Sequence, residues 1–296
     1  MIKNYRKTKI LATIGPSSKE IKKIEKLVLS GVDAFRINCS HTKATELKSY
    51  VENIRKVEKK LKQPIGILID LQGPKLRIGE IENEQVVLKK GQKVSLINRK
   101  KSSNCNEIPL PDENVFKSVK VKHPIFIDDG RIKLKVLKVS KNIIETRVIL
   151  EGVIKSKKGI NLPETILKGS ALTISDKKNV KIGIDLGVDW VALSFIQSPD
   201  DIEELRKICK KKLSIMAKIE KPRALKYINK IAKLSDGLMI ARGDLGVELP
   251  IQDVPGWQKR IIREARIHGK PVVVSTQMLE SMITSKTPTR AEVSDV

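Results

Sequence analysis

Apolar residues occur along this chain in short runs, and these runs alternate with segments whose apolar positions recur at helical spacing. Alternation of strand-like and helix-like segments is typical of a parallel α/β fold. The pattern predicts seven strands, at residues 10–14, 34–38, 65–70, 190–195, 213–219, 237–241 and 272–276. Helices are predicted between them, at about residues 18–30, 43–61, 176–186, 199–211, 222–234 and 256–268.

The pattern changes between the third and fourth of these strands, where residues 73–168 are purely strand-like. Apolar residues alternate there with lysines between Ile132 and Val136, as a half-buried strand requires. We therefore divide the chain into a barrel-type α/β domain, residues 1–72 and 169–296, and an inserted β domain, residues 73–168. Insertions that follow a strand of a parallel barrel emerge on its catalytic face, so this domain is expected to act as a lid.

The chain is strongly basic, with 59 Lys and Arg against 34 Asp and Glu and a formal net charge of +25. A basic surface attracts polyanions, so nucleic acid is the first class of partner to consider. Aromatic residues make up only 3% of the chain, which leaves few side chains to stack on bases, and we disfavour a nucleic-acid function. No apolar stretch approaches the roughly 20 residues that span a bilayer, and the amino terminus does not resemble a signal peptide, so no membrane partner and a cytoplasmic location are expected.

The clearest chemical signal lies at the ends of two neighbouring strands. Lys218 and Glu220 stand two residues apart at the end of the strand predicted at 213–219, and Asp244 follows the strand predicted at 237–241. A helix between two strands makes them parallel, and strand side chains alternate, so these three groups should converge at one edge of the sheet. Two carboxylates beside a lysine offer hard oxygen ligands for magnesium and a cation for a phosphate group.

Several further runs occur in the order found in one enzyme family, at residues 36–41, 73–77, 158–163, 218–220, 241–246 and 275–282. On these motifs the whole chain resembles the pyruvate kinases. The resemblance implies a (βα)8 TIM-type barrel with an inserted small β-barrel lid domain, followed by a regulatory α/β domain. Only seven of the eight barrel strands, and no regulatory domain, precede Val296. We therefore expect an incomplete barrel whose open sheet edges make it unstable or sticky on its own.

The resemblance also implies an activity and roles for the converging groups. The family transfers phosphoryl from phosphoenolpyruvate to ADP, giving pyruvate and ATP in the last step of glycolysis, and its members require magnesium and are commonly homotetrameric. Glu220 and Asp244 correspond to the magnesium ligands. Lys218 corresponds to the residue that stabilises the transferring phosphoryl group and the enolate, and Arg36 to the arginine that contacts the phosphate.

Other positions are implied to bind substrate and nucleotide. Gly243 and the backbone amide of Asp244 resemble the cradle for the substrate carboxylate, where glycine permits close approach. Thr276 resembles the hydroxyl near the enolate carbon, with a part in its protonation. Nucleotide contacts are implied for Asn38, Cys39, Ser40, His41, Arg77 and Lys158.

One departure concerns potassium, which most members of the family require. The corresponding positions here are Asn38, Ser40, Asp70 and Leu71, with leucine where the family has threonine. The position that is usually glutamate in potassium-dependent members is Lys75, and this set resembles the potassium-independent subgroup. We expect potassium to be dispensable, because the lysine ammonium can supply the single positive charge of the ion.

Two alternatives remain open. One is another magnesium-dependent barrel enzyme acting on pyruvate or phosphoenolpyruvate, such as a lyase, against which Arg77 and the lid motif argue. The other is an inactive remnant or fragment that binds phosphorylated metabolites, or RNA through its basic surface.

Overall fold

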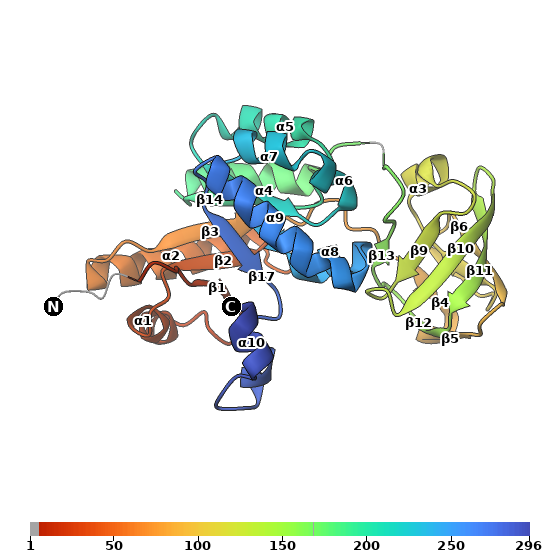
Figure 1. Cartoon of the computed structure of the whole chain (residues 1–296), viewed down its shortest axis with the longest axis horizontal. Helices are drawn as coiled ribbons and strands as arrows, with labels where there is room; N and C mark the ends of the chain where they lie inside the picture. The colour runs from red at the N-terminus through yellow and green to blue at the C-terminus, as the bar shows by residue number, and fades with distance from the viewer. Residues whose placement is uncertain (1–5, 168) are drawn as a thin grey trace.

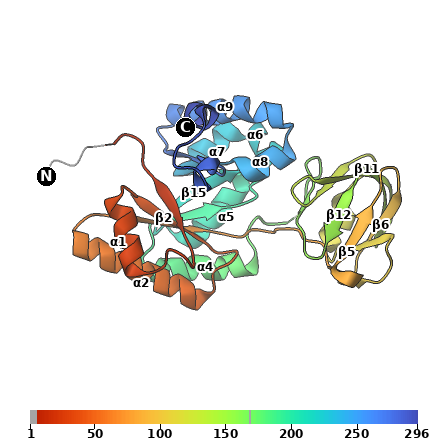
Figure 2. The same cartoon turned by 90° about the horizontal axis from the view of Figure 1, so that it is seen from below.

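The computed structural model describes residues 6–167 and 169–296, which form two units (Figures 1 and 2). One unit is a parallel sheet with its flanking helices. The other, which we call the β unit, contains the strands between residues 80 and 161. Residues 1–5 and 168, which belong to the predicted domain ranges, lie outside the described residues.

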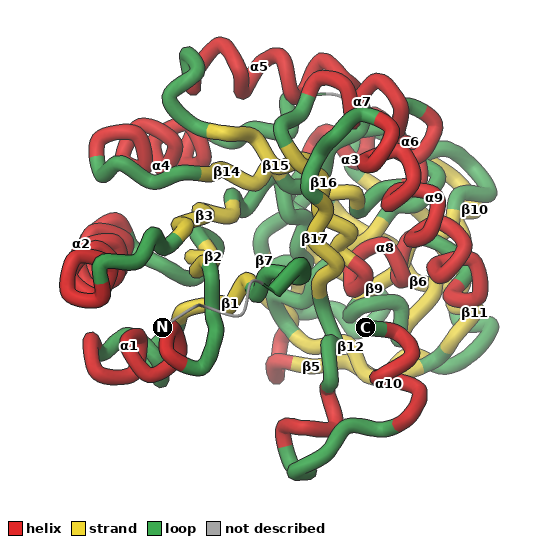
Figure 3. The backbone as a smooth tube through the Cα atoms, turned by 60° about the vertical axis from the view of Figure 1, so that its left-hand side comes forward, coloured by secondary structure: helices red, strands yellow, loops and turns green. Residues whose placement is uncertain are grey.

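The parallel sheet has seven strands that run side by side in a curved row (Figure 3). Their order along the sheet is β1 (Leu11–Ile14), β2 (Ala34–Asn38), β3 (Gly66–Asp70), β14 (Trp190–Leu193), β15 (Ser214–Ile219), β16 (Gly237–Ala241) and β17 (Val272–Ser275). Every neighbouring pair is parallel. The predicted α/β fold with a curled, barrel-type sheet is confirmed, and all seven predicted strands are present.

The helices lie on the outer side of this curve (Figure 3). They are α1 (Ile21–Leu29), α2 (Ala44–Leu61), α4 (Ile174–Asp185), α5 (Pro199–Cys209), α6 (Pro222–Lys226), α7 (Ile228–Leu234), α8 (Arg242–Glu248) and α9 (Val254–Ile267), with α10 (Arg290–Asp295) near the end of the chain. The single helix predicted at 222–234 is wrong, because the backbone departs from helical geometry at Tyr227. Apolar side chains between sheet and helices, such as Phe35 and Ile69, form the main core.

The β unit has a core of its own, built on side chains such as Leu96, Ile127 and Leu134. Its strands are β4 (Glu80–Ile81), β5 (Gln85–Leu88), β6 (Lys93–Ile97), β7 (Lys101–Ser102), β8 (Glu107–Pro109), β9 (Pro124–Ile127), β10 (Ile132–Val139), β11 (Ile143–Leu150), β12 (Gly152–Lys155) and β13 (Ile160–Asn161), with one helix, α3 (Glu113–Ser118). The alternation between Ile132 and Val136 is confirmed, since β10 buries every second residue. The role of this unit as a lid stays a prediction.

Asp176 ties the two connections between the units together. This buried carboxylate, in the first turn of α4, accepts hydrogen bonds from the backbone amides of Gln72 at 3.0 Å and Gly73 at 3.2 Å on the outgoing connection. It also accepts the backbone amide of Thr173 at 2.9 Å, on the returning connection. Asp176 therefore anchors both connections to the sheet unit, at the points where they join that unit. Within the described residues, no helix is both long enough and apolar enough to cross a membrane.

Candidate active site

The inner face of the curved sheet changes character along its strands. Its middle layer is apolar and buried, with Leu68, Ala192, Met216 and Met239 in contact. Because strand side chains repeat every two residues, the next residue on the same face in β3 is Asp70 and in β15 is Lys218. The polar groups thus gather at the carboxyl ends of the strands, directly above an apolar floor that excludes water.

Lys218 is the centre of this polar layer. Its ammonium lies 2.8 Å from Glu220 Oε1 and 3.1 Å from Asp70 Oδ1, and it donates a hydrogen bond of 2.8 Å to Ser194 Oγ. The side chain is only 11% exposed. Burial alone would lower the pKa of Lys218, but the two carboxylates outweigh it and raise the pKa above its ordinary value. The two carboxylates therefore favour the charged ammonium at this largely buried position.

Arg36 contacts one of these two carboxylates, Asp70, from β2. Its Nη2 lies 2.6 Å from Asp70 Oδ2, its Nε donates to the same oxygen at 2.7 Å, and its Nη1 donates to Thr13 Oγ1 at 3.0 Å. Asp70 thus stands between the guanidinium of Arg36 and the ammonium of Lys218. It holds two cations close together, which suits the binding of a group that carries more than one negative charge.

Glu220 is buried and incompletely satisfied. Its Oε2 accepts a hydrogen bond of 2.7 Å from the backbone amide of Phe195. Its Oε1 forms an ion pair with Lys218 at 2.8 Å but has no hydrogen-bond partner among the described residues. Burial raises the pKa of Glu220, and the charge of nearby Asp244 raises it further, against the opposing effect of Lys218. A buried carboxylate oxygen without a hydrogen-bond partner, beside a second carboxylate, is a donor set that a divalent cation would satisfy. The two predicted magnesium ligands therefore lie close enough to influence each other, as expected.

Gly243 and Thr276 are also brought together. A Cβ added to Gly243 would lie 3.0 Å from Cγ2 of Thr276, so a side chain at this position would crowd Thr276. Arg242 holds the segment that carries Thr276, since its guanidinium donates to the backbone oxygen of Thr276 at 2.5 Å and pairs with Asp295. The residue after strand β17, with a φ of +76°, is thus fixed against the start of α8.

Residues 38–41, from the last residue of β2 onward, form a compact turn at the same end of the sheet. The amide of Ser40 donates to Asn38 Oδ1 at 3.1 Å, and the amide of Cys39 donates to the backbone oxygen of Asp70 at 2.9 Å. Burial, with the neighbouring charge of Asp70, raises the pKa of the Cys39 thiol to about 12, which disfavours the reactive thiolate. His41 follows at the exposed end of the turn.

Arg77 and Lys158 lie at the base of the β unit and have partners there. Arg77 Nη1 donates to the backbone oxygen of Lys157 at 3.1 Å, and Lys158 Nζ pairs with Asp128 Oδ1 at 2.8 Å. Among the described residues, no hydrogen bond or ion pair joins either of them to the turn at residues 38–41. Their prediction as nucleotide ligands is untested, and Lys158 would have to leave Asp128 to contact a nucleotide.

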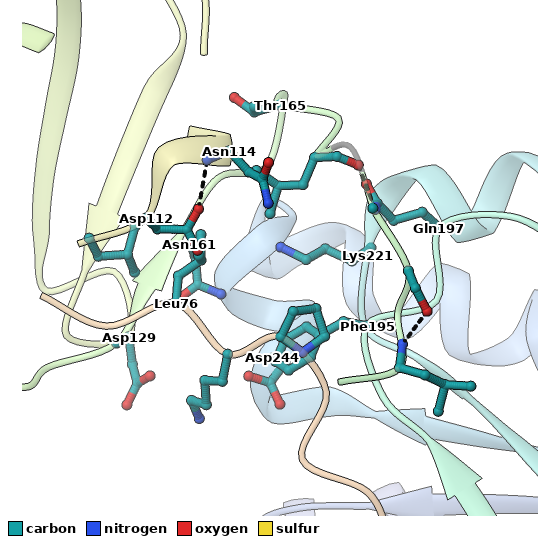
Figure 4. Close-up of a pocket in the computed structure, with 18 residues that line it drawn as sticks. Leu76, Asp112, Asn114, Asp129, Asn161, Thr165, Phe195, Gln197, Lys221 and Asp244 are labelled. Atoms are coloured by element: carbon teal, nitrogen blue, oxygen red, sulfur yellow. Dashed lines mark hydrogen bonds between the residues drawn. The ribbon is translucent and has the colours of Figure 1, made fainter. Parts of the chain in front are cut away.

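A cavity of about 190 Å³ lies between the two units (Figure 4). Asp112, Asn114 and Asp129 of the β unit line one side, and side chains of the sheet unit line the other, among them Phe195, Gln197, Lys221 and Asp244. Lys75, on the outgoing connection, also lines it. Asp244 is thus shared between this cavity and the buried cluster around Glu220.

The sequence analysis missed Thr13, Ser194 and Phe195 in this site. Ser194 and Phe195 directly follow β14, beyond the carboxyl end of a strand like Glu220 and Asp244, so this position was a usable signal. Phe195 has a φ of +56°, which turns its backbone amide toward Glu220. Nothing in the sequence alone indicates that conformation.

Comparison with known proteins identifies a family to which this chain is similar. Residues 5–296 match the sequence model of the family described as pyruvate kinase, barrel domain. The chain is 48% identical over 295 residues to a pyruvate kinase of Methylorubrum extorquens, covering 100% of this chain and 62% of that protein. It is 41% identical to a pyruvate kinase of Thermococcus litoralis, covering 98% and 62%.

A solved structure from the same family is also similar to this chain. The crystal structure of a pyruvate kinase from Cryptosporidium parvum superposes with a TM-score of 0.94 at 32% identity, covering 98% of this chain and 61% of that one. The chain thus spans about three fifths of the length of the relatives it matches.

Proposed function

Because the chain belongs to the pyruvate kinase family, we propose that it carries the active site for phosphoryl transfer from phosphoenolpyruvate to ADP, giving pyruvate and ATP. The observation that supports this most is the buried cluster in which Asp70 joins Arg36 to Lys218, with Glu220 and Asp244 beside them. Phosphoryl transfer needs little covalent chemistry from the protein. It requires fixed positive charge where negative charge develops, and the cluster supplies that.

Each cation has a distinct part in the proposal. The ammonium of Lys218 stays charged, because two buried carboxylates raise its pKa, and it faces the phosphoryl group and the enolate oxygen that remains after transfer. The planar guanidinium of Arg36 binds phosphoryl oxygens in a bidentate manner. Glu220 and Asp244 would hold magnesium, which when bound neutralises charge on the phosphoryl oxygens.

The substrate carboxylate is proposed to bind at the start of α8, over Gly243 and the backbone amide of Asp244. Glycine at position 243 has no Cβ to crowd Thr276, so it leaves the backbone accessible to close approach there. Thr276 then stands beside the carbon that receives a proton when the enolate becomes pyruvate. Arg242 fixes it through its backbone oxygen.

The nucleotide is proposed to bind between the turn at residues 38–41 and the β unit, with Arg77 and Lys158 as its cationic partners. Closure of the β unit over the cavity would bring the two groups of residues together. Lys75 lines that cavity, and we propose that it provides the charge that potassium supplies in most members of the family.

The test is pyruvate formation from phosphoenolpyruvate, measured with and without ADP and magnesium. We expect formation only when both are present. Glu220→Gln should abolish it, whereas Glu80→Gln, at an exposed site in the β unit, should leave the rate unchanged. Pyruvate formation without ADP would indicate a lyase instead. Binding of phosphoenolpyruvate with no turnover under any of these conditions would refute the proposed activity of this chain.

A further inference from the structure

Glu248, the last residue of α8, joins the two units through a buried carboxylate. Its side chain is completely inaccessible, and its Oε1 accepts a hydrogen bond of 2.9 Å from Asn161 Nδ2 of the β unit. The same oxygen pairs with the ammonium of Lys221, in the sheet unit. One carboxylate oxygen therefore binds a donor from each unit. We call this set of three residues the Glu248 bridge.

The bridge lies on the segments that carry the proposed metal ligands. Lys221 directly follows Glu220, and Glu248 stands one helical turn after Asp244 on α8. Asn161 ends β13, on the connection that returns from the β unit. A movement of the β unit relative to α8 therefore acts directly on the short segments that hold both carboxylates.

Two further contacts support this position. A Cβ built on Gly130, in the turn between β9 and β10, would lie 3.6 Å from Cγ1 of Val247, so this turn packs beside α8 next to the bridge. Lys221 Nζ lies 5.8 Å from the ring centroid of Phe195, whose amide binds Glu220. In Figure 4, Asn161 and Lys221 both border the cavity that Asp244 also lines.

The bridge contains one group that is not satisfied. Among the described residues, the buried Glu248 Oε2 has no hydrogen-bond partner, which costs free energy. The carboxylate therefore depends on Asn161 and Lys221, which both bind its other oxygen. Loss of either partner would leave a buried charge less satisfied, so it should weaken the hold of α8 on the β unit.

We propose that Asn161, Glu248 and Lys221 are positioning residues that hold the β unit against α8, and so set where the β unit stands relative to the Glu220 and Asp244 pair. The effect of that position on catalysis rests on the proposed function. The bridge itself, and its control over the position of the β unit, do not depend on that function.

The position of the β unit can be measured without reference to activity. Cys105, in the β unit, is the exposed one of the three cysteines, whereas Cys39 and Cys209 are buried. A spin label on Cys105 and a second on Lys259→Cys, an exposed position in α9, give a distance between the units by pulsed electron paramagnetic resonance. The unmodified bridge should give one dominant distance.

Asn161→Asp places a second carboxylate against Glu248, so we expect a second population at a different distance. The exchanged pair Asn161→Asp with Glu248→Gln restores a carboxylate and an amide, with the donor now at position 248, and should return the single distance. Lys221→Met leaves the Glu248 carboxylate without its cation and should also shift the distance, which provides an independent variant if Asn161→Asp does not fold. Asn142→Asp, in the exposed turn between β10 and β11, is the matched control.

The kinetic consequence separates positioning from a general loss of stability. Asn161→Asp should lower kcat and raise the KM for ADP, each about tenfold, and leave the KM for phosphoenolpyruvate within about twofold; the exchanged pair should recover both. The inference is wrong if Asn161→Asp and Lys221→Met keep the distance of the unmodified protein, or if the exchanged pair does not restore it. If the distances respond as expected while every protein fails to form pyruvate, the bridge stands and the proposed function fails.

Discussion

Replacing Lys218 with methionine tests the electrostatic reasoning about the buried cluster. The substitution keeps the apolar stem and removes the ammonium, with its ion pairs to Asp70 and Glu220 and its hydrogen bond to Ser194. Removing one partner of a buried pair costs about 3–5 kcal/mol. Asp70 keeps Arg36 at 2.6 Å, so most of the cost arises at Glu220, which retains only the amide of Phe195. We therefore expect a loss of about 3 kcal/mol, at the low end of that range.

The assay is urea unfolding followed by tryptophan fluorescence, in the presence of a chelator. The chain has two tryptophans, Trp190 and Trp257, and both lie in the sheet unit, so the signal reports the unit that holds the cluster. Lys48→Met is the matched control. Its exposed ion pair to Glu52, at 3.9 Å one helical turn away, contributes about 0.5 kcal/mol or less.

Two companion measurements sharpen this prediction. The double variant Lys218→Met with Glu220→Gln removes the unpaired charge and should recover all but about 1 kcal/mol of the loss. The loss should also shrink as pH falls. Glu220 has a raised pKa in the folded state, so between its unfolded and folded pKa values the folded protein binds a proton that the unfolded chain does not. The free energy of unfolding therefore falls as pH rises between those two values. The reasoning is refuted if Lys218→Met lowers the free energy of unfolding no more than Lys48→Met does. It is also refuted if the double variant loses as much free energy of unfolding as its two single variants together.

Three other predictions address different parts of the molecule. Gly243→Ala places a Cβ 3.0 Å from Thr276, so kcat should fall about tenfold or more with little change in circular dichroism. Unchanged kinetics would contradict the proposal that the substrate carboxylate binds over Gly243. Hydrogen bonds from Ser281 lower the pKa of Glu292 to about 2. The contribution of Glu292 to holding α10 is therefore present above pH 4.5 and is lost as pH falls toward 2, so hydrogen exchange of the α10 amides should rise over that range. An equal rise in the Glu292→Gln variant would contradict this account. Lys75→Glu should introduce a requirement for potassium in the pyruvate assay, whereas the unmodified chain should need none. Equal potassium dependence of the two proteins would refute the proposal that the Lys75 ammonium takes the place of potassium.

Much of the sheet follows from local pattern. Its seven strands were all predictable from short apolar runs between helical segments, because a strand buried on both faces needs such a run. The prediction erred where tertiary contacts overrule the pattern. The strand predicted at 190–195 ends at Leu193, since Phe195 takes a left-handed backbone against Gly73. Likewise, the helix predicted at 222–234 divides at Tyr227.

For the candidate site, the sequence by itself determined which residues share a face and an end of the sheet. The two-residue period places Lys218 and Glu220 on one face, and the strand order brings Asp244 to the same edge. The first argument is local to one strand, and the second needs only that the two strands are parallel neighbours.

Only the tertiary structure decided how these groups are paired. Asp70 stands between Arg36 and Lys218 because β2, β3, β14 and β15 lie in one register, and Glu248 reaches Asn161 because the β unit returns beside α8. Hydrogen bonds and ion pairs depend on distances of a few ångströms between residues far apart in the chain. Those distances are set by packing of the whole fold, and no pattern within a single segment contains them.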